Sequence, residues 1–232
     1  MAIIKKLIKK IMIKKAMSKS PMYLYGEDEQ EEVEKYICDA FGEFASVFHE
    51  LVSPDIHLDV CLIPPSDEEP YYKLVTLGAG AYKMNVPDEL LDDKLEYAEY
   101  VIYLPENWNI KSNNETDFWP IRVLKGIARL PIYCDTWLGY GHTTQDDEEG
   151  TAYASNTQFN SVVLDFASNK RGDIRLKLSS GKVINFYEVI PLYPEELQYK
   201  LDNDADILFD RFKEKGIKYK VVDIDRKNAC KE

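Results

Sequence analysis

Cysteine and histidine are scarce in this sequence, which limits the chemistry that the chain can carry. The four cysteines, Cys38, Cys61, Cys134 and Cys230, are far apart, and no two of them form a C-x-x-C pair. A chain of 232 residues with 45% hydrophobic residues can build a core without disulfide bonds. We therefore expect reduced thiols that are mostly buried, with Cys230 exposed in a polar C-terminal segment.

The motifs of several common enzyme classes are also missing. The sequence contains neither G-x-S-x-G nor G-x-x-x-x-G-K-[ST]. Gly78-Ala79-Gly80 supplies only two glycines of a dinucleotide-binding fingerprint, and Pro87 follows soon after it, so this segment predicts a tight turn. These absences argue against the enzyme classes that depend on those motifs.

Two small sets of residues leave alternatives open. His57 and Asp59 lie on the polar face of a predicted strand, and His49 would approach His57 if the strands on either side of the intervening turn pair. Two imidazoles and a carboxylate are suitable metal ligands, but no further ligand spacing accompanies them, so solvent-facing polar residues are favoured. Cys134 and His142 form the second set, a thiol and an imidazole without an evident catalytic companion.

The chain carries a net negative charge, but that charge is unevenly distributed along the sequence. The net charge is −12, yet residues 1–20 contain seven lysines and no acidic residue, so the rest of the chain carries −19. Such a body repels phosphate backbones, which argues against nucleic-acid binding. It favours a basic partner, and the alternative is an acidic surface that only maintains solubility.

Residues 1–22 are predicted to form a basic amphipathic helix ahead of the body. Six apolar residues have the spacing of one helical face, with lysines on the other: Ile3, Ile4, Leu7, Ile8, Ile11 and Met12. The segment is too charged to span a bilayer and has no signal-peptide cleavage site, but its residues 1–20 could contact an anionic membrane surface. The alternatives are loose packing on the acidic body, or an appendage ahead of a natural start at Met17 or Met22.

Residues 23–223 are predicted to form a single α+β domain, followed by a polar tail at 224–232. Helices are expected from residue 27, over 117–130 with Asp117 as N-cap, and as one long helix from residue 194 to 212. Strands are expected at 46–52, 56–62, 71–77, 97–104, 161–166, 174–178, 183–190 and 218–222. Alternation of Ile56, Leu58, Val60 and Leu62 with polar residues predicts a half-buried strand. Because hairpins dominate, we expect a mixed, mostly antiparallel sheet packed with helices.

The long connection at 131–158 contains the most unusual segment of the chain. Trp137, Tyr140 and His142 lie among glycines, and aromatic side chains on such a loop are typical anchors for a protein partner. The alternative is that Trp137 fills the core while the glycines permit sharp turns. Four consecutive acids follow, and they predict an exposed, mobile loop that a basic partner could contact: Asp146, Asp147, Glu148 and Glu149.

Several ordered stretches resemble bacterial proteins of the suppressor of fused (SUFU) family. They are SVFHELV at 46–52, HLDV at 57–60, IPP at 63–65, WPIR at 119–122, DTWLGYGHT at 135–143, FY at 186–187, VIPLY at 189–193, EE at 195–196, YKL at 199–201, AD at 205–206 and RF at 211–212. The resemblance extends over roughly residues 23–213. The basic N-terminal segment lies outside it.

This resemblance implies a compact α+β domain without a cofactor or a known reaction. Animal members of the family sequester a transcription factor through a bound peptide. Bacterial members are often encoded beside polymorphic toxins and are thought to act as immunity proteins. We therefore expect a non-enzymatic, cytoplasmic protein that binds and neutralises a cognate toxin domain of basic character. The alternative is a regulatory adaptor that sequesters a signalling or transcription protein through a bound peptide.

Overall fold

The computed structural model describes residues 22–50, 53–169 and 172–231. The predicted N-terminal basic helix lies outside these residues. The α-helices are α2 (Glu27–Phe41), α3 (Glu115–Cys134), α4 (Pro194–Asp202) and α5 (Ala205–Glu214), and the 3₁₀ helices are η1 (Ala79–Ala81) and η2 (Asp88–Asp93). The strands are β1 (Ser46–Phe48), β2 (Asp59–Ile63), β3 (Tyr71–Leu77), β4 (Tyr97–Pro105), β5 (Thr143–Gln145), β6 (Ser161–Phe166), β7 (Ser168–Asn169), β8 (Gly172–Asp173), β9 (Arg175–Lys177) and β10 (Val183–Leu192).

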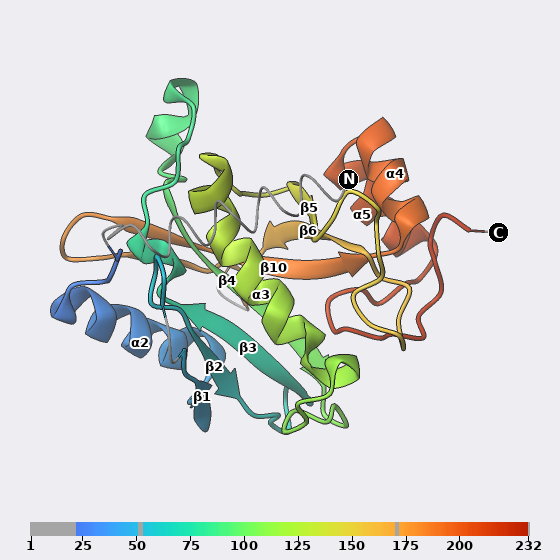
Figure 1. The fold of residues 1–232 in the computed structure, drawn as a ribbon, viewed down its shortest axis with the longest axis horizontal. Coiled ribbons are helices and arrows are strands. Elements are labelled where there is room, and N and C mark those ends of the chain that lie inside the picture. Colours follow the sequence, from blue (N-terminus) through green and yellow to red (C-terminus); the bar gives the residue numbers. More distant parts are fainter. Residues whose placement is uncertain (1–21, 51–52, 170–171, 232) are drawn as a thin grey trace.

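One mixed sheet organises the described chain. Its strand order is β1-β2-β3-β4-β10-β6-β5, and β9 also pairs with β10. The pairing of β4 with β10 is parallel, whereas the other pairings in this sheet are antiparallel. The predicted α+β class with a mostly antiparallel sheet is therefore confirmed. Figure 1 shows α3 lying across one face of the sheet, with α2 behind its lower part and α4 and α5 beside the far end of β10.

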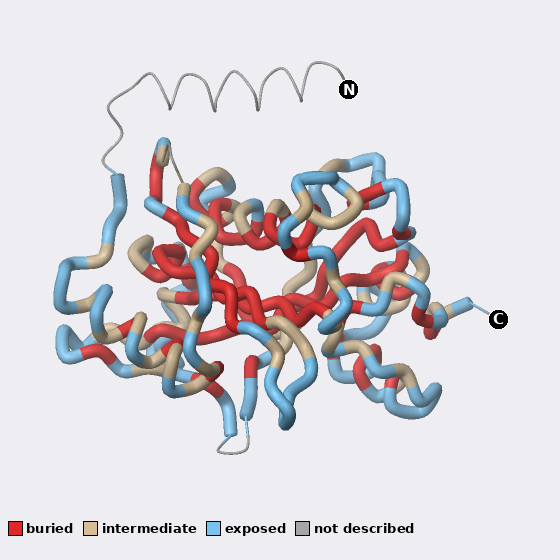
Figure 2. Tube along the Cα trace, turned by 90° about the horizontal axis from the view of Figure 1, so that it is seen from below, coloured by how far each residue is buried: buried red, intermediate tan, exposed pale blue. Residues whose placement is uncertain are grey.

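Both faces of the sheet are buried, which corrects the prediction for β2. Leu58, Val60 and Leu62 belong to the apolar cluster beneath α3, whereas Cys61 and Ile63 belong to a second cluster that includes the buried face of α2. Every residue of β2 is consequently buried, and the strand is not half-exposed as the alternation suggested. In Figure 2 the buried residues form a continuous layer along the central strands, with helices above and below it.

The helix α2 begins at Glu27, as the sequence predicts. Three acidic residues in its first turn face the positive end of the helix dipole: Glu27, Asp28 and Glu29. Val33, Ile37 and Phe41 form its fully buried stripe. The helix ends at Gly42, whose φ of 111° lies in a region that side chains other than glycine rarely adopt.

Helix α3 is longer than expected at both ends. Asn114 occupies the N-cap position, and Asp117 lies inside the first turn, so the predicted cap was wrong by three residues. The helix continues through Pro131 to Cys134, which shortens the predicted connection, and β5 forms within the rest of it. No helix in the described part of the chain is long and apolar enough to cross a membrane.

The predicted long C-terminal helix is two helices, α4 and α5. Asn203 has φ of −128° and ψ of −116°, which ends α4, and the carboxylate of Asp204 accepts a hydrogen bond of 2.8 Å from the backbone N–H of Ile207, which caps α5. The break leaves Leu201 58% exposed, although a continuous helix would have placed it on the buried stripe. The sequence signal for the break was the capping residue at 204.

Other elements differ from the prediction in smaller ways. β1 ends at Phe48, and residues 51–52 lie outside the described part. The predicted strand at 218–222 is reduced to one isolated parallel bridge between Tyr103 and Val221. Of the three cysteines expected to be buried, Cys61 is buried, Cys38 is half-buried and Cys134 is exposed. Cys230, which was expected to be exposed, is half-buried.

The segment expected as a polar tail contains residues that pack against the body. The guanidinium of Arg226 lies 2.6 and 2.7 Å from the two carboxylate oxygens of Glu196, and their side chains are 5% and 0% exposed. The same guanidinium lies over three aromatic rings: Phe159, Tyr193 and Phe212. Further along, Ala229 is buried against α5. Residues as far as Ala229 therefore contribute to the core.

Glu188 on β10 introduces a buried carboxylate between two apolar clusters. Its side chain is fully buried, and Asp165 is the residue opposite it on the neighbouring strand β6. In the described chain its one ion pair is with Lys220, at 3.3 Å. Burial raises the pKa of Glu188 to about 7 from an ordinary value of 4.5, Lys220 opposes the shift, and Asp165 adds to it. The folded state therefore favours the protonated carboxyl. This contribution to stability is present below pH 4.5 and is lost as the pH rises through about 7.

Glu188→Gln should therefore remove a pH dependence from folding. Between pH 5 and pH 8 we expect the free energy of unfolding of the wild type to fall by about 2 to 3 kcal/mol relative to that of the variant, because the glutamine cannot ionise. Urea unfolding at a series of pH values measures this difference. The exposed Glu106→Gln is the matched control and should follow the wild type. Parallel profiles for wild type and Glu188→Gln would show that Glu188 does not titrate in this range.

Candidate functional site

The aromatic loop that follows α3 is held in place by its own residues. Asp135 has φ of 49° and ends α3 in a left-handed conformation. The rings of Trp137 and His142 lie 4.3 Å apart, edge to face, and the backbone N–H of His142 donates to the carbonyl of Gly139 at 3.1 Å. A Cβ on Gly139 would lie 2.7 Å from the Trp137 ring, so this close approach requires glycine. The loop therefore presents a fixed aromatic pair.

Trp137 combines the two roles that the sequence left open, that of a partly exposed partner anchor and that of a core residue. It is half-buried and packs against the apolar cluster beneath α3. The imidazole of His142 is also half-buried, and burial lowers its pKa, with Lys200 adding to the effect and the Trp137 backbone opposing it. His142 is consequently neutral at neutral pH. No contact in the described structure joins His142 to Cys134, which is exposed at the end of α3.

Tyr140 connects the loop to β6 and to α5. Its ring stacks on Phe166 with centroids 4.8 Å apart and planes 7° from parallel, and it also contacts Phe209. Its hydroxyl donates to the carboxylate of Asp206. Burial and Asp206 both raise the pKa of Tyr140, so the phenol stays protonated. The loop, the end of β6 and the start of α5 thus form one connected surface.

Phe166 is the residue of this surface that sequence reasoning missed. It is 38% exposed, and it lies at the end of β6 beside Tyr140 and the buried Tyr187. It also lines a groove of 720 Å³ whose other apolar walls include Leu95, Ile174 and Phe186. The only sequence signal was a large apolar residue at the end of a strand, which is common in ordinary cores.

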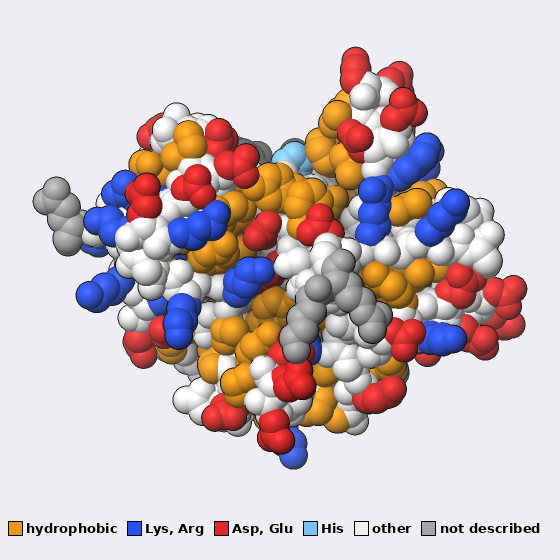
Figure 3. Space-filling view, turned by 180° about the vertical axis from the view of Figure 1, so that it is seen from behind, with side chains coloured by type: hydrophobic (Ala, Val, Ile, Leu, Met, Phe, Trp, Pro, Cys, Tyr) orange, Lys and Arg blue, Asp and Glu red, His pale blue; other side chains and the backbone are white. Residues whose placement is uncertain are grey.

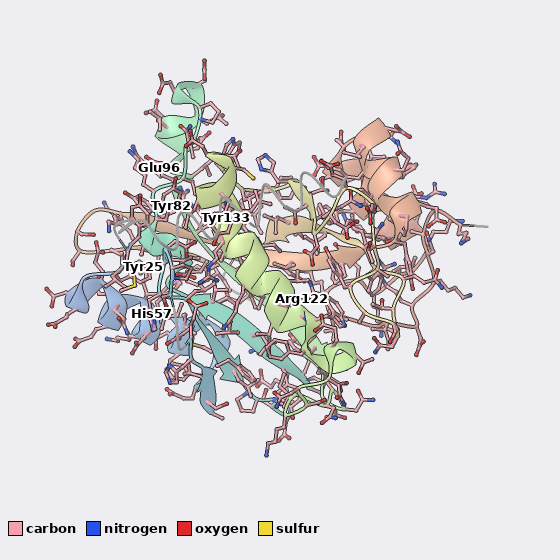
Figure 4. The ribbon with its side chains drawn as sticks, in the orientation of Figure 1. Tyr25, His57, Tyr82, Glu96, Arg122 and Tyr133 are labelled. Atoms are coloured by element: carbon pink, nitrogen blue, oxygen red, sulfur yellow. The ribbon has the colours of Figure 1, made fainter. Side chains whose placement is uncertain are left out.

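The four consecutive acids after the loop are more constrained than the sequence suggested. Asp146 forms an ion pair with Arg122, which projects from α3 in Figure 4 and also bonds Glu115 at 2.6 Å. A carboxylate oxygen of Asp147 accepts hydrogen bonds from two backbone N–H groups, those of Glu149 and Thr151. Glu148 and Glu149 have exposed side chains. The predicted exposed, mobile loop is thus tied down at its first two residues.

The two histidines and the aspartate considered as metal ligands, His49, His57 and Asp59, lie close together, but no further ligand accompanies them in the described part of the chain. Nδ1 of His49 lies 2.9 Å from one oxygen of Asp59, and Nε2 of His57 lies 3.6 Å from the other. Within the described residues, no group of three or more histidines, cysteines or acids is arranged to hold a metal ion. Figure 4 places His57 far from α4 and α5, so this cluster is separate from the aromatic surface.

Comparison with known proteins identifies the class to which this chain belongs. The family model described as suppressor of fused protein (SUFU) matches residues 54–227. The match covers most of the chain, so the chain belongs to the suppressor of fused family, a family of protein-binding and regulatory domains. None of the curated proteins matches the sequence.

Solved structures share the fold at low sequence identity. A SUFU homologue from Neisseria gonorrhoeae FA 1090 is 18% identical, with a TM-score of 0.61 over 89% of this chain and 100% of that one. The Sufu–Fu complex matches with 11% identity and a TM-score of 0.59 over 91% of this chain and 93% of the other. Drosophila Suppressor of Fused matches with 9% identity and a TM-score of 0.52, over 86% of this chain and 50% of its own.

Proposed function

We propose that this chain is a non-enzymatic, cytoplasmic immunity protein that binds and neutralises a cognate toxin domain of basic character. Membership of a protein-binding family supports a protein partner, and the charge of −19 outside residues 1–20 supports a basic one. The observation that carries the proposal is the preformed aromatic surface of Trp137, Tyr140, His142 and Phe166, because rigid, partly exposed rings anchor protein partners at low entropic cost.

The acidic residues after the loop complete the proposed contact surface. Glu148 and Glu149 are exposed, whereas Asp146 and Asp147 hold the loop in position. Long-range attraction between opposite charges accelerates association and weakens as salt is added. We therefore assign the aromatic rings to affinity and the acids at 146–149 to the rate of encounter. An acidic body repels nucleic acid, so the proposed partner is protein alone.

Co-expression with the toxin domain encoded by a neighbouring gene tests this function. The cells should survive, and the two proteins should purify as one complex. Phe166→Ala should weaken that complex by about ten- to a hundredfold, because it removes an exposed ring and the support for Tyr140. Leu24→Ala, which truncates an exposed apolar residue elsewhere, is the control. Cell death without a complex would refute the immunity role.

The groove beside Phe166 favours a second candidate function, that of a regulatory adaptor. At 720 Å³ and with apolar residues from β6, from β10 and from the segment after η2, it has room for an extended peptide. Such an adaptor would sequester a signalling or transcription protein. A pull-down that returns such a protein, from a genome with no toxin gene beside this one, would favour the adaptor over the immunity protein.

A further inference from the structure

The corner between α4 and α5 exposes apolar side chains that the sequence pattern would bury. Leu201 is 58% exposed and Ile207 is 42% exposed. With Phe166 they make up three of the six large hydrophobic residues exposed in the described chain, and the other three are consecutive at 22–24. Grouped exposure of this kind marks a contact surface more often than single exposed residues do.

Three aspartates lie within a few residues of Leu201 and Ile207 in the sequence, and each accepts a hydrogen bond from an uncharged donor. Asp202 accepts from Gln198 at 2.8 Å, Asp204 accepts from the backbone N–H of Ile207, and Asp206 accepts from the hydroxyl of Tyr140. Within the described residues, none of the three forms an ion pair with a lysine or arginine. In Figure 3 the projection formed by α4 and α5, at the upper left, carries acidic and apolar side chains, with lysine and arginine side chains along its lower flank. Lys213 lies close enough for Asp206 to help raise its pKa, so the negative charge of this corner is only partly compensated.

We propose that the α4–α5 corner, defined by Leu201, Asp202, Asp204, Asp206 and Ile207, docks a basic protein segment that carries aliphatic side chains. Aliphatic groups of that segment cover Leu201 and Ile207, and its lysines or arginines pair with the aspartates. The hydroxyl of Tyr140 links the corner to the aromatic loop through Asp206, so the two surfaces are continuous. This assignment rests on the proposed function and names the chemistry of the partner.

A designed peptide of leucine and lysine, LKKLLKLLKKLLKL, is a suitable probe of this chemistry. Its binding to the full chain is measured by fluorescence anisotropy. One matched peptide replaces the lysines with glutamate, and another replaces the leucines with serine. The parent peptide should bind the wild type, and each replacement should weaken binding about tenfold or more.

Two variants of the full chain locate the site. Leu201→Ser with Ile207→Ser removes the apolar contacts from exposed positions. Asp202→Asn, Asp204→Asn and Asp206→Asn together remove three charges but keep the hydrogen-bond acceptors, and asparagine remains a good N-cap. Each variant should lose about tenfold or more in affinity for the parent peptide. The controls are Leu24→Ser and Asp67→Asn, which change exposed residues elsewhere, and they should bind like the wild type.

The outcomes separate this inference from the proposed function. Unchanged peptide affinity in both corner variants, with their folding confirmed by circular dichroism, would overturn the corner as a docking site. If the toxin complex forms normally with both corner variants, the corner does not dock the toxin, so its assignment as the toxin contact fails while the immunity role stands. If the peptide binds at the corner but no toxin complex forms, the corner stands as a basic-segment site and the immunity role fails.

Discussion

Arg226→Met is expected to lower the free energy of unfolding by about 3 to 5 kcal/mol. The substitution leaves the carboxylate of Glu196 buried and without its charged partner, and a buried uncompensated charge is costly. It also removes the cation over the rings of Phe159, Tyr193 and Phe212. Urea denaturation followed by circular dichroism measures the change.

The neighbouring residue provides the control for this prediction. Lys227→Met alters an exposed side chain on the same segment and should change stability by less than about 0.5 kcal/mol. In the double variant Arg226→Met with Glu196→Gln, part of the loss should be recovered, because the buried charge is gone. A decrease of less than about 1 kcal/mol in the free energy of unfolding of Arg226→Met would mean that the segment at 224–229 does not stabilise the C-terminal part of the domain.

Glu99→Ala should be similarly destabilising, by about 3 to 5 kcal/mol, for a different reason. The Glu99 side chain is buried, and it accepts hydrogen bonds from three successive backbone N–H groups of the turn at 78–80, as well as from the hydroxyls of Tyr25 and Thr76. Alanine leaves those donors unpaired in the interior. Gly78 has φ of 121° and a Cβ there would lie 2.0 Å from the carbonyl of His57, so the turn cannot easily rearrange.

Thermal and chemical unfolding of a small set of variants checks this role. Glu99→Gln retains one acceptor oxygen and should lose less than Glu99→Ala. Glu106→Ala, on the exposed segment after β4, should lie within about 0.5 kcal/mol of the wild type. If Glu99→Ala were no more destabilised than Glu106→Ala, the hydrogen bonds around Glu99 would not stabilise this turn.

Local patterns in the sequence predicted most of the individual elements. The start of α2 at residue 27 and the bounds of β3, β4 and β6 were predicted to within one residue, because each depends on a few neighbouring residues. The burial of Cys61 and Ile63 was not predictable in this way. It arises because α2, from another part of the chain, covers the second face of β2. The parallel pairing of β4 with β10 is likewise a long-range feature.

Local sequence patterns likewise predicted some residues of the candidate site and missed others. Trp137, Tyr140 and His142 were found because aromatics between glycines are unusual within a short window. Phe166, Leu201 and Ile207 were missed because nothing local distinguishes them from core residues, and their exposure appears only in the folded chain. The ion pair of Asp146 with Arg122 joins residues 24 positions apart, so the constraint on the acidic loop could not be predicted from a short sequence window.

We propose that this suppressor of fused domain binds a second polypeptide through its aromatic surface and acidic charge. Titration of the purified full chain with the purified toxin domain of the neighbouring gene, by calorimetry at 50 and 300 mM salt, tests it most directly. We predict a one-to-one complex that weakens about tenfold or more at the higher salt and more strongly still after Phe166→Ala. No detectable heat at either salt concentration, or an affinity that neither salt nor Phe166→Ala alters, would contradict it.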